Sequence, residues 1–257
     1  MKNYEFNMIE EYIKNKVLIL ENEFKEYFFK IFPNRNEKYF NYYLMGFYRN
    51  NLLYKFDNNK LKSTINRKKF EISLDLDIDL RIKLENIYPT TIISYYNISI
   101  FNNFISLQLQ HNIHIIEVYS YMKETVLSIL LNNNKYAVLE EDYDIIRKYA
   151  NCGEIYIVKT INDDSPIIRR KGKINNTSSV ITVPKIEKLL IDILVDDFYK
   201  NNMSSEITNI YYNVLKHYQI NQTTLFRYAR KRYCYDKLLL LFEYIGYDKE
   251  RGEFKWY

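Results

Sequence analysis

Cysteine, histidine and glycine are scarce in this chain of 257 residues, which contains two, three and five of them respectively. Cys152 and Cys234 lie far apart and lack CxxC spacing, so we expect reduced thiols in a cytoplasmic protein. Three histidines cannot supply a His-rich metal cage, and five glycines leave no Gly-rich phosphate loop. We therefore expect neither a metal site nor a cofactor.

Long apolar runs are also missing. The longest aliphatic stretches, VLIL at 17–20 and LLLLF at 238–242, are far shorter than the roughly 18 apolar residues that a membrane span needs. The first thirty residues mix acidic, basic and aromatic side chains throughout, which is unlike a signal peptide. We expect a cytoplasmic protein that makes no contact with a membrane.

The residues that are present predict a folded protein with a mild positive charge. Apolar residues make up 47% of the chain and charged residues 27%, and the net charge is +5. Residues 1–66 hold 11 Lys and Arg against 8 Asp and Glu, whereas the remaining 191 residues hold 26 against 24. The charge permits nucleic-acid binding, and the N-terminal part is the more basic per residue.

The first 66 residues have the pattern of a winged helix-turn-helix domain. Apolar spacing predicts helices over 5–15, 21–32 and 36–51, with the short β-prone run VLIL after the first and a turn at Pro33 after the second. Two β-prone runs around DNN in 52–64 predict a hairpin, which would be the wing. We place the domain boundary at residue 66.

Residues 67–257 alternate between strand and helix patterns and then become helical. A helix is predicted over 77–88 before Pro89, and from Pro184 onward four helices are predicted, over 184–198, 204–218, 222–232 and 236–245. The expected fold class is therefore α/β (α+β): an N-terminal winged helix-turn-helix followed by a mixed-sheet domain with a helical C-terminal tail.

The helix at 36–51 is the first candidate site, because a winged helix-turn-helix presents such a helix to the major groove and its wing to the DNA backbone. Asn can bond adenine bidentately, and Arg and Lys can reach guanine or phosphate. The predicted DNA-binding residues are Asn36, Lys38, Tyr39, Asn41, Tyr42, Arg49, Lys55, Lys60 and Lys62. The same fold can also serve as a lid or a partner-binding module.

A second basic helix is predicted at 222–232. Its cations are Arg227, Arg230, Lys231 and Arg232, and the first three share one helix face. This face is either a patch for nucleic acid or an acidic partner, or the solvated side of a packed helix. The pattern leaves both interpretations open.

An enzyme on the sheet is the alternative function. A metal-dependent nuclease or nucleotidyltransferase would use Asp75, Asp77 and Glu117 to hold a metal. However, Tyr119 occupies the position where a nuclease motif has Lys, and no Gly-Ser precedes the DLDID carboxylates. We therefore predict no catalysis by this chain. A plain winged-helix transcription factor is a further alternative.

The C-terminal segments VPKIEKLLIDILVDD (183–197) and INQTTLFRYARKR (220–232) resemble the signature end of a bacterial family related to the AbiEi antitoxins. The matching residues are Pro184, Glu187, Lys188, Asp192, Asp196, Ile220, Asn221, Arg227, Tyr228, Ala229 and Arg232. Lys231 stands where the family more often has Arg. The family tends to have a Trp near TIISYYNISIFNNFI, where this chain has Tyr95, Tyr96 and Phe101.

The resemblance implies a function that composition does not show. Such proteins belong to type IV toxin–antitoxin operons of abortive infection, a form of phage defence. Their winged helix binds the operon's own promoter, where we expect inverted repeats, and represses transcription. Their C-terminal domain, here 67–257, counteracts a nucleotidyltransferase-like toxin without needing a stable complex with it, and direct contact between this chain and its toxin is left open. The basic helix face would then be an antitoxin or partner surface.

Overall fold

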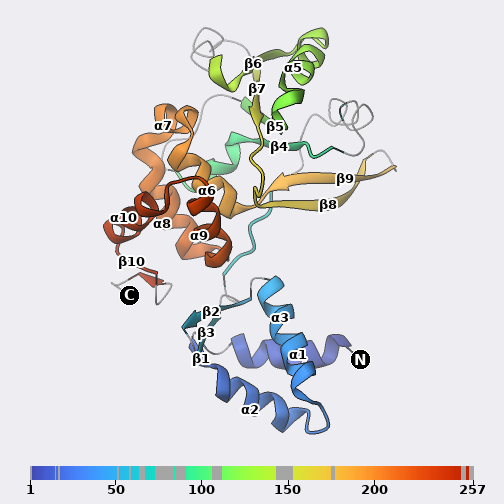
Figure 1. Ribbon diagram of the computed structural model, residues 1–257, viewed down its shortest axis with the longest axis vertical. Coiled ribbons are helices and arrows are strands. Elements are labelled where there is room, and N and C mark those ends of the chain that lie inside the picture. Colours follow the sequence, from blue (N-terminus) through green and yellow to red (C-terminus); the bar gives the residue numbers. More distant parts are fainter. Residues whose placement is uncertain are drawn as a thin grey trace. The chain divides into compact units, whose positions relative to one another are not determined.

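The computed structural model, whose elements are labelled in Figure 1, divides into two compact units: residues 1–70 together with 212–257, and residues 71–211. The structure describes residues 2–14, 16, 18–50, 52–57, 59–63, 67–72, 84, 91–105, 112–142, 153–174, 177–249 and 253–254. The expected fold class is confirmed: helices and a small sheet in winged-helix order are followed by a mixed sheet and a helical tail. No described helix is long and apolar enough to cross a membrane.

The N-terminal part has the element order of a winged helix-turn-helix. Its elements are α1 (Lys2–Lys14), β1 (Leu18–Leu20), α2 (Glu21–Ile31), α3 (Glu37–Arg49), β2 (Leu53–Asp57) and β3 (Lys60–Ser63). The strands pair antiparallel in the order β1-β3-β2, with Ile19 opposite Leu61 and Lys55 opposite Leu61. β2 and β3 therefore form the predicted wing, and the strand predicted at VLIL supplies the third strand.

Phenylalanine side chains hold the three helices together. Phe24 and Phe28 of α2 meet Phe40 of α3 edge-on, with ring centroids 5.5 Å apart in both pairs, and Phe6 of α1 stacks on Phe47 at 4.4 Å. Phe24 and Phe28 are four residues apart and Phe40 and Phe47 are seven apart, which places each pair on one face of its helix. The core of this part is thus aromatic, and it fixes the direction of α3.

Residues near the C-terminal end of the same unit are hydrogen-bonded to the residues that follow the wing. The backbone of Lys68 donates to His217 O and accepts from Gln219 N, both at 2.9 Å, and Gln219 Nε2 donates to Arg67 O at 2.8 Å. The elements here are α8 (Ile207–His217), α9 (Gln222–Lys231), α10 (Tyr235–Tyr244), β10 (Tyr247–Asp248) and β11 (Glu253–Phe254). The stretch after residue 66 is therefore bonded to residues 217–219.

The two compact units group the C-terminal residues differently from the predicted domains. The predicted first boundary at residue 66 lies four positions before Phe70, where the first segment of the first unit ends. The sequence pattern placed residues 212–257 with the sheet domain, whereas the compact units group them with residues 1–70. The division into 1–66 and 67–257 stays a prediction.

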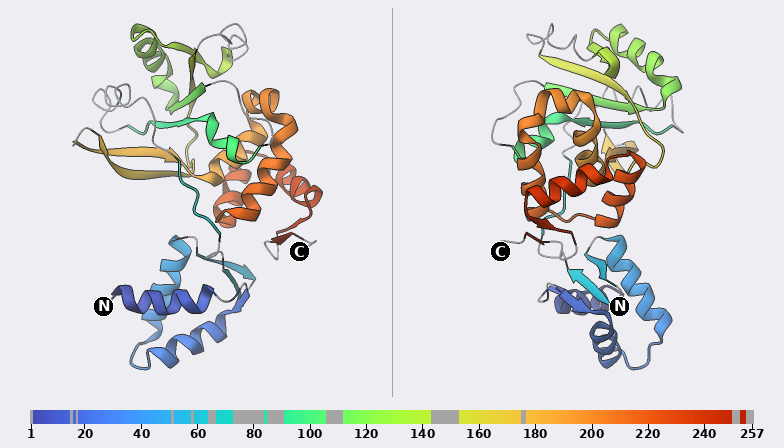
Figure 2. Two further views of the ribbon diagram at one scale, coloured as in Figure 1. Left: turned by 180° about the vertical axis from the view of Figure 1, so that it is seen from behind. Right: turned by 60° about the vertical axis from the view of Figure 1, so that its left-hand side comes forward.

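The second unit is built on a mixed sheet in the order β6-β7-β5-β4-β9-β8 (Figure 2). The strands are β4 (Ser94–Asn97), β5 (Asn112–Val118), β6 (Tyr136–Leu139), β7 (Glu154–Thr160), β8 (Ile167–Ile174) and β9 (Thr177–Pro184). β5, β7 and β6 run parallel, whereas β4 is antiparallel to β5 and β8 to β9. Residues 113–118 of β5 are buried without alternation, as in a strand covered on both faces.

Helices and 3₁₀ turns complete this unit. They are η1 (Ile98–Asn103), η2 (Ser120–Met122), α5 (Lys123–Asn132), α6 (Ile186–Val195), α7 (Asp197–Met203), η4 (Ser204–Glu206) and the start of α8. Val126 and Leu130 of α5 share a buried cluster with Ile116 and Tyr156 of the sheet. The helix predicted at 77–88 lies, except for Leu84, outside the described residues.

Candidate nucleic-acid interface

The exposed face of α3 carries most of the residues predicted to contact DNA. Lys38, Asn41, Tyr42 and Arg49 are all exposed, and Tyr42 retains 63% of its surface. Met45, which the sequence reasoning missed, is 49% exposed on the same face. Spacings of three, four and seven residues from Lys38 align these side chains on one side of the helix. They form what we call the α3 face: Lys38, Asn41, Tyr42, Met45 and Arg49.

Two further predicted residues, Asn36 and Tyr39, lie at the start of α3. Asn36 is the N-cap, and its Oδ1 accepts hydrogen bonds from the backbone N–H groups of Lys38 at 3.1 Å and Tyr39 at 3.3 Å. Its side-chain oxygen is therefore occupied in starting the helix. Tyr39 is 45% exposed, and the Arg35 guanidinium lies 4.6 Å from the centre of its ring. Both residues position α3 more directly than they offer free groups to DNA.

A partly buried carboxylate connects α1 to α3. Glu5 accepts a hydrogen bond from Tyr43 and another from Arg35 at 3.0 Å. The bonds from Tyr43 and then Arg35 lower the pKa of Glu5, which keeps it ionised. Burial, followed by the bond to Glu5, raises the pKa of Tyr43 to about 12. Glu5 therefore helps to hold α3 in place while the opposite face of the helix stays open.

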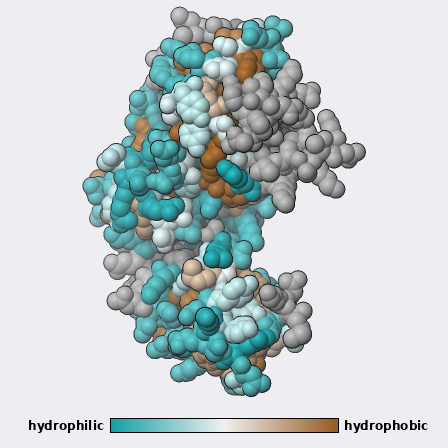
Figure 3. All heavy atoms as spheres, turned by 45° about the vertical axis from the view of Figure 1, so that its right-hand side comes forward, coloured by the Kyte–Doolittle hydropathy of each residue, from teal (hydrophilic) through white to brown (hydrophobic). Residues whose placement is uncertain are grey.

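The wing offers fewer cations than the sequence predicted. Lys55 on β2 is exposed and Lys60 on β3 is half-buried, so both can reach a nearby phosphate. Lys62 is only 2% exposed, because β3 is the middle strand and Lys62 lies between Leu18 and Tyr54 in the sheet register. The prediction that Lys62 contacts a phosphate is therefore wrong for this conformation. Figure 3 shows hydrophilic residues over most of the visible surface of the winged helix.

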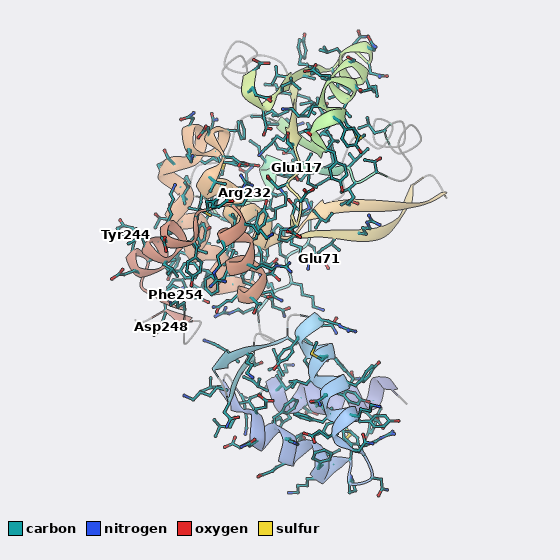
Figure 4. All side chains as sticks on the ribbon, in the orientation of Figure 1. Glu71, Glu117, Arg232, Tyr244, Asp248 and Phe254 are labelled. Atoms are coloured by element: carbon teal, nitrogen blue, oxygen red, sulfur yellow. The ribbon has the colours of Figure 1, made fainter. Side chains whose placement is uncertain are left out.

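The second basic helix, α9, separates its four cations into two groups. Arg227, Arg230 and Lys231 are exposed, and the Arg230 guanidinium lies 4.3 Å from the Tyr235 ring centre. Arg232 is half-buried at the C-cap and donates a hydrogen bond from Nη1 to Tyr228 Oη at 3.1 Å. Arg232, which is labelled in Figure 4, thus helps to pack the helix end. The α9 face available to a partner consists of Arg227, Arg230 and Lys231.

The other signature residues of this segment build the helix. Asn221 is the N-cap of α9, since its Oδ1 accepts from Thr224 N at 2.9 Å. Leu225, Tyr228 and Ala229 are buried on the opposite side from the cations. The segment 220–232 is therefore an amphipathic helix with a capped start and a basic outer face.

The earlier signature segment, 183–197, contributes a buried network of charges. Lys188 of α6 donates to Glu117 of β5 and, at 2.5 Å, to Asp192 one turn along the helix. All three side chains are at most 2% exposed. Figure 4 labels Glu117, which stands within the sheet. The two carboxylates compensate the buried ammonium group.

Lys159 and Asp196 extend this network of buried charges to the neighbouring strand, β7. Lys159 of β7 is the register partner of Glu117 and forms an ion pair with Asp196. Its ammonium group also lies 5.3 Å from the Tyr199 ring centre. Burial alone would lower the pKa of Lys159, but the carboxylates led by Asp196 raise it above its ordinary value. Burial raises the pKa of Asp192 despite the adjacent Lys188. Sequence reasoning missed this network, although charged residues within the apolar run IEKLLIDILV were a signal for it.

The residues of the enzyme alternative are only partly described. Asp75 and Asp77 lie outside the described residues, and Glu117 forms the ion pair with Lys188. Glu117 Oε2 and its cross-strand neighbour Ser94 Oγ are buried without a hydrogen-bond partner in the described part of the chain. In that same part, no group of three or more His, Cys, Asp or Glu side chains is arranged to hold a metal ion.

Comparison with known proteins adds a family. Residues 39–245 match the model of a family of unknown function (DUF6577), which spans most of α3, the wing, the sheet and the helical tail as far as α10. No curated protein matches the chain significantly. Because the match covers most of its length, the chain belongs to this family of unknown function.

Proposed function

We propose that this protein is a cytoplasmic DNA-binding autorepressor that also acts as the antitoxin of a type IV toxin–antitoxin system. The DNA-binding half of the proposal rests on one observation: the exposed α3 face of a winged helix carries Lys38, Asn41 and Arg49, and the exposed acidic residue beside it, Glu37, is paired with Lys25. The antitoxin half rests on the resemblance of 183–197 and 220–232 to AbiEi-related antitoxins. The proposal assigns no catalysis to the chain.

The α3 face suits the major groove in size and in chemistry. An α-helix with its side chains is about 10–12 Å in diameter, and the groove is about 12 Å wide, so α3 can lie within it. Asn41 lies between Lys38 and Arg49 along the helix, and its amide can pair with adenine N6 and N7. Lys38 and Arg49 stand near the two ends, where they can contact phosphates or guanine.

A mobility-shift titration of the promoter fragment with the full chain tests the DNA-binding half. Asn41→Ala is expected to weaken promoter binding by about 1–3 kcal/mol while affecting an unrelated duplex less, because it removes a base contact. Lys55→Ala with Lys60→Ala should weaken binding to all sequences and flatten the salt dependence by about 0.9 for each phosphate that the protein no longer neutralises. Lys30→Ala, which removes an exposed cation from α2, is the control. Unchanged promoter affinity in both α3 and wing variants would refute the interface.

The antitoxin half is tested by growth. The full chain is co-expressed with the neighbouring toxin gene, and recovery from growth arrest is measured. Reversal of the α9 face, Arg227→Glu with Arg230→Glu and Lys231→Glu, should abolish rescue while leaving promoter binding intact, if this face meets the toxin or its target. The matched control reverses three other exposed cations, Lys14, Lys30 and Lys237. No rescue by the folded wild-type chain would count against the antitoxin assignment.

A further inference from the structure

The hairpin of β8 and β9 extends beyond the sheet to which it belongs. The two strands pair along their whole length, from Ile167 opposite Pro184 to Ile174 opposite Thr177. Only one position, Thr182, also pairs with β4. The rest of the hairpin is therefore a two-stranded ribbon with no third strand among the described residues, as Figure 1 shows where β8 and β9 run out past β4.

The ribbon has an unusual charge. Its residues 167–184 include Arg169, Arg170, Lys171 and Lys173 and no Asp or Glu, in a chain whose charges elsewhere are nearly balanced. Between 169 and 179 the sequence is RRKGKINNTSS, in which Ile174 is the only large apolar residue. Arg169, the first of the four cations, is exposed.

We propose that the β8–β9 ribbon is a second DNA-binding element, separate from α3, which contacts the phosphates of a duplex. A two-stranded ribbon fits the major groove of B-DNA, as a helix does. Eight residues in each strand give it a length of roughly 26 Å, which is enough to follow the groove past several phosphates.

The composition favours DNA over a protein partner. An interface with another protein has an apolar, aromatic-rich centre, whereas an interface with DNA is polar and strongly positive. The two strands supply four cations, one threonine and two serines between residues 169 and 179, residue types that can donate to phosphate oxygens. The partner that matches this chemistry is the sugar–phosphate backbone.

A competing explanation is that the cations protect an open strand edge. β8 is the last strand of the sheet, and natural proteins place Lys and Arg on such edges to prevent pairing with another chain. The two roles have different consequences. Removing edge protection causes self-association, whereas removing cations that neutralise phosphates weakens DNA binding and lowers its dependence on salt.

The test uses the full chain with Arg170→Gln, Lys171→Gln and Lys173→Gln combined. Its affinity for an unrelated duplex and for the promoter is measured over a range of salt concentrations, from about 50 to about 200 mM, with light scattering to follow association. We expect binding to both duplexes to weaken roughly tenfold or more at low salt, and the slope of log affinity against log salt to flatten by about 0.9 for each phosphate left without its cation. The ratio of the two affinities should stay the same.

Ser178→Ala with Ser179→Ala is the matched control, because it alters the facing strand and keeps all four cations. An unchanged salt slope in the triple glutamine variant, with or without self-association, would overturn the proposal. The result for the ribbon can be distinguished from a failure of the proposed α3 interface. If the α3 and wing variants bind normally and only the ribbon variant loses binding, the α3 interface fails and the ribbon stands.

Discussion

At the scale of single residues, Glu5 of α1 helps to orient α3 through two side-chain hydrogen bonds. It accepts hydrogen bonds from Tyr43 within α3 and from Arg35 in the preceding turn. The side chain of Glu5 is 16% exposed, so water screens these bonds only in part. The carboxylate therefore links α1, the turn and α3 by charge-assisted bonds.

Glu5→Gln is expected to destabilise the winged helix by about 1 kcal/mol at pH 7, because an amide replaces a charged acceptor. The folded-state pKa of Glu5 lies below its unfolded value. Its stabilisation is therefore complete above the unfolded pKa of about 4.3 and is lost as the pH falls through the folded pKa. Urea unfolding of both proteins at pH 7 and pH 3 measures this, and the difference should shrink at pH 3.

Glu26→Gln is the control for this measurement, since Glu26 is an exposed carboxylate on α2. It should leave the stability almost the same at both pH values. A Glu5→Gln difference that is equally large at pH 3 would show that packing, and not the charge, accounts for the effect.

At the scale of elements, α6 differs most from what its sequence would suggest for a surface helix. Residues 186–194 are all buried, including Glu187, Lys188 and Asp192. A helix surrounded on all sides can keep charged groups only if they are paired. The pairing comes from Glu117 of β5 and from Asp192 itself. The charged residues Lys188 and Asp192 of the signature segment 183–197 therefore have a structural role, since they form buried ion pairs within the second unit.

Lys188→Met should destabilise the protein by about 3–5 kcal/mol, because it leaves Glu117 and Asp192 buried without their cation. Adding Glu117→Gln and Asp192→Asn should restore a large part of this stability, since the two carboxylates that lost Lys188 would then carry no charge, while Lys159 keeps its ion pair with Asp196. Denaturant unfolding of the full chain measures both effects. Lys185→Met, at the half-buried N-cap of the same helix, is the control. A destabilisation below about 1 kcal/mol would contradict this account of the network.

The type of each element in the first 66 residues was predictable because apolar spacing along the chain is a local property. The helices over 5–15, 21–32 and 36–51 and the hairpin at 52–64 correspond to α1, α2, α3 and the wing. The burial of Lys62 was not predictable, because a cation on a hairpin gives no sign that the strand is central. Met45 was missed because an apolar residue within a helix is ordinarily assigned to the core.

At the scale of the whole molecule, the chain returns at its C-terminal end to the residues that follow the wing. Lys68 bonds through its backbone to His217 and Gln219, and the Phe70 ring meets Tyr218 with centroids 6.0 Å apart. Residues 67–70, which follow the predicted boundary at residue 66, are therefore held in place. This agrees with the grouping of residues 212–257 with residues 1–70.

We expect the backbone amide of Lys68 to exchange slowly with solvent hydrogen, because it donates to His217 O. Gln219→Ala removes the side-chain bond to Arg67 O and should accelerate exchange in 67–72 severalfold. Hydrogen exchange followed by mass spectrometry measures this. Asn209→Ala, which removes a side-chain bond elsewhere on α8, should leave 67–72 unchanged. Exchange of this segment at the rate of an unfolded chain in the wild type would contradict the anchoring.

The local pattern of the chain was sufficient for the helices and the hairpin of the first 66 residues and for the exposed cations of α3 and α9, since each depends on residues within a few positions. The tertiary structure alone decided the partners that lie far apart in sequence. Lys188 meets Glu117 across 71 positions, and Gln219 meets Arg67 across 152. Periodicity reports which side of an element is apolar, but which other element covers that side depends on the folded chain as a whole.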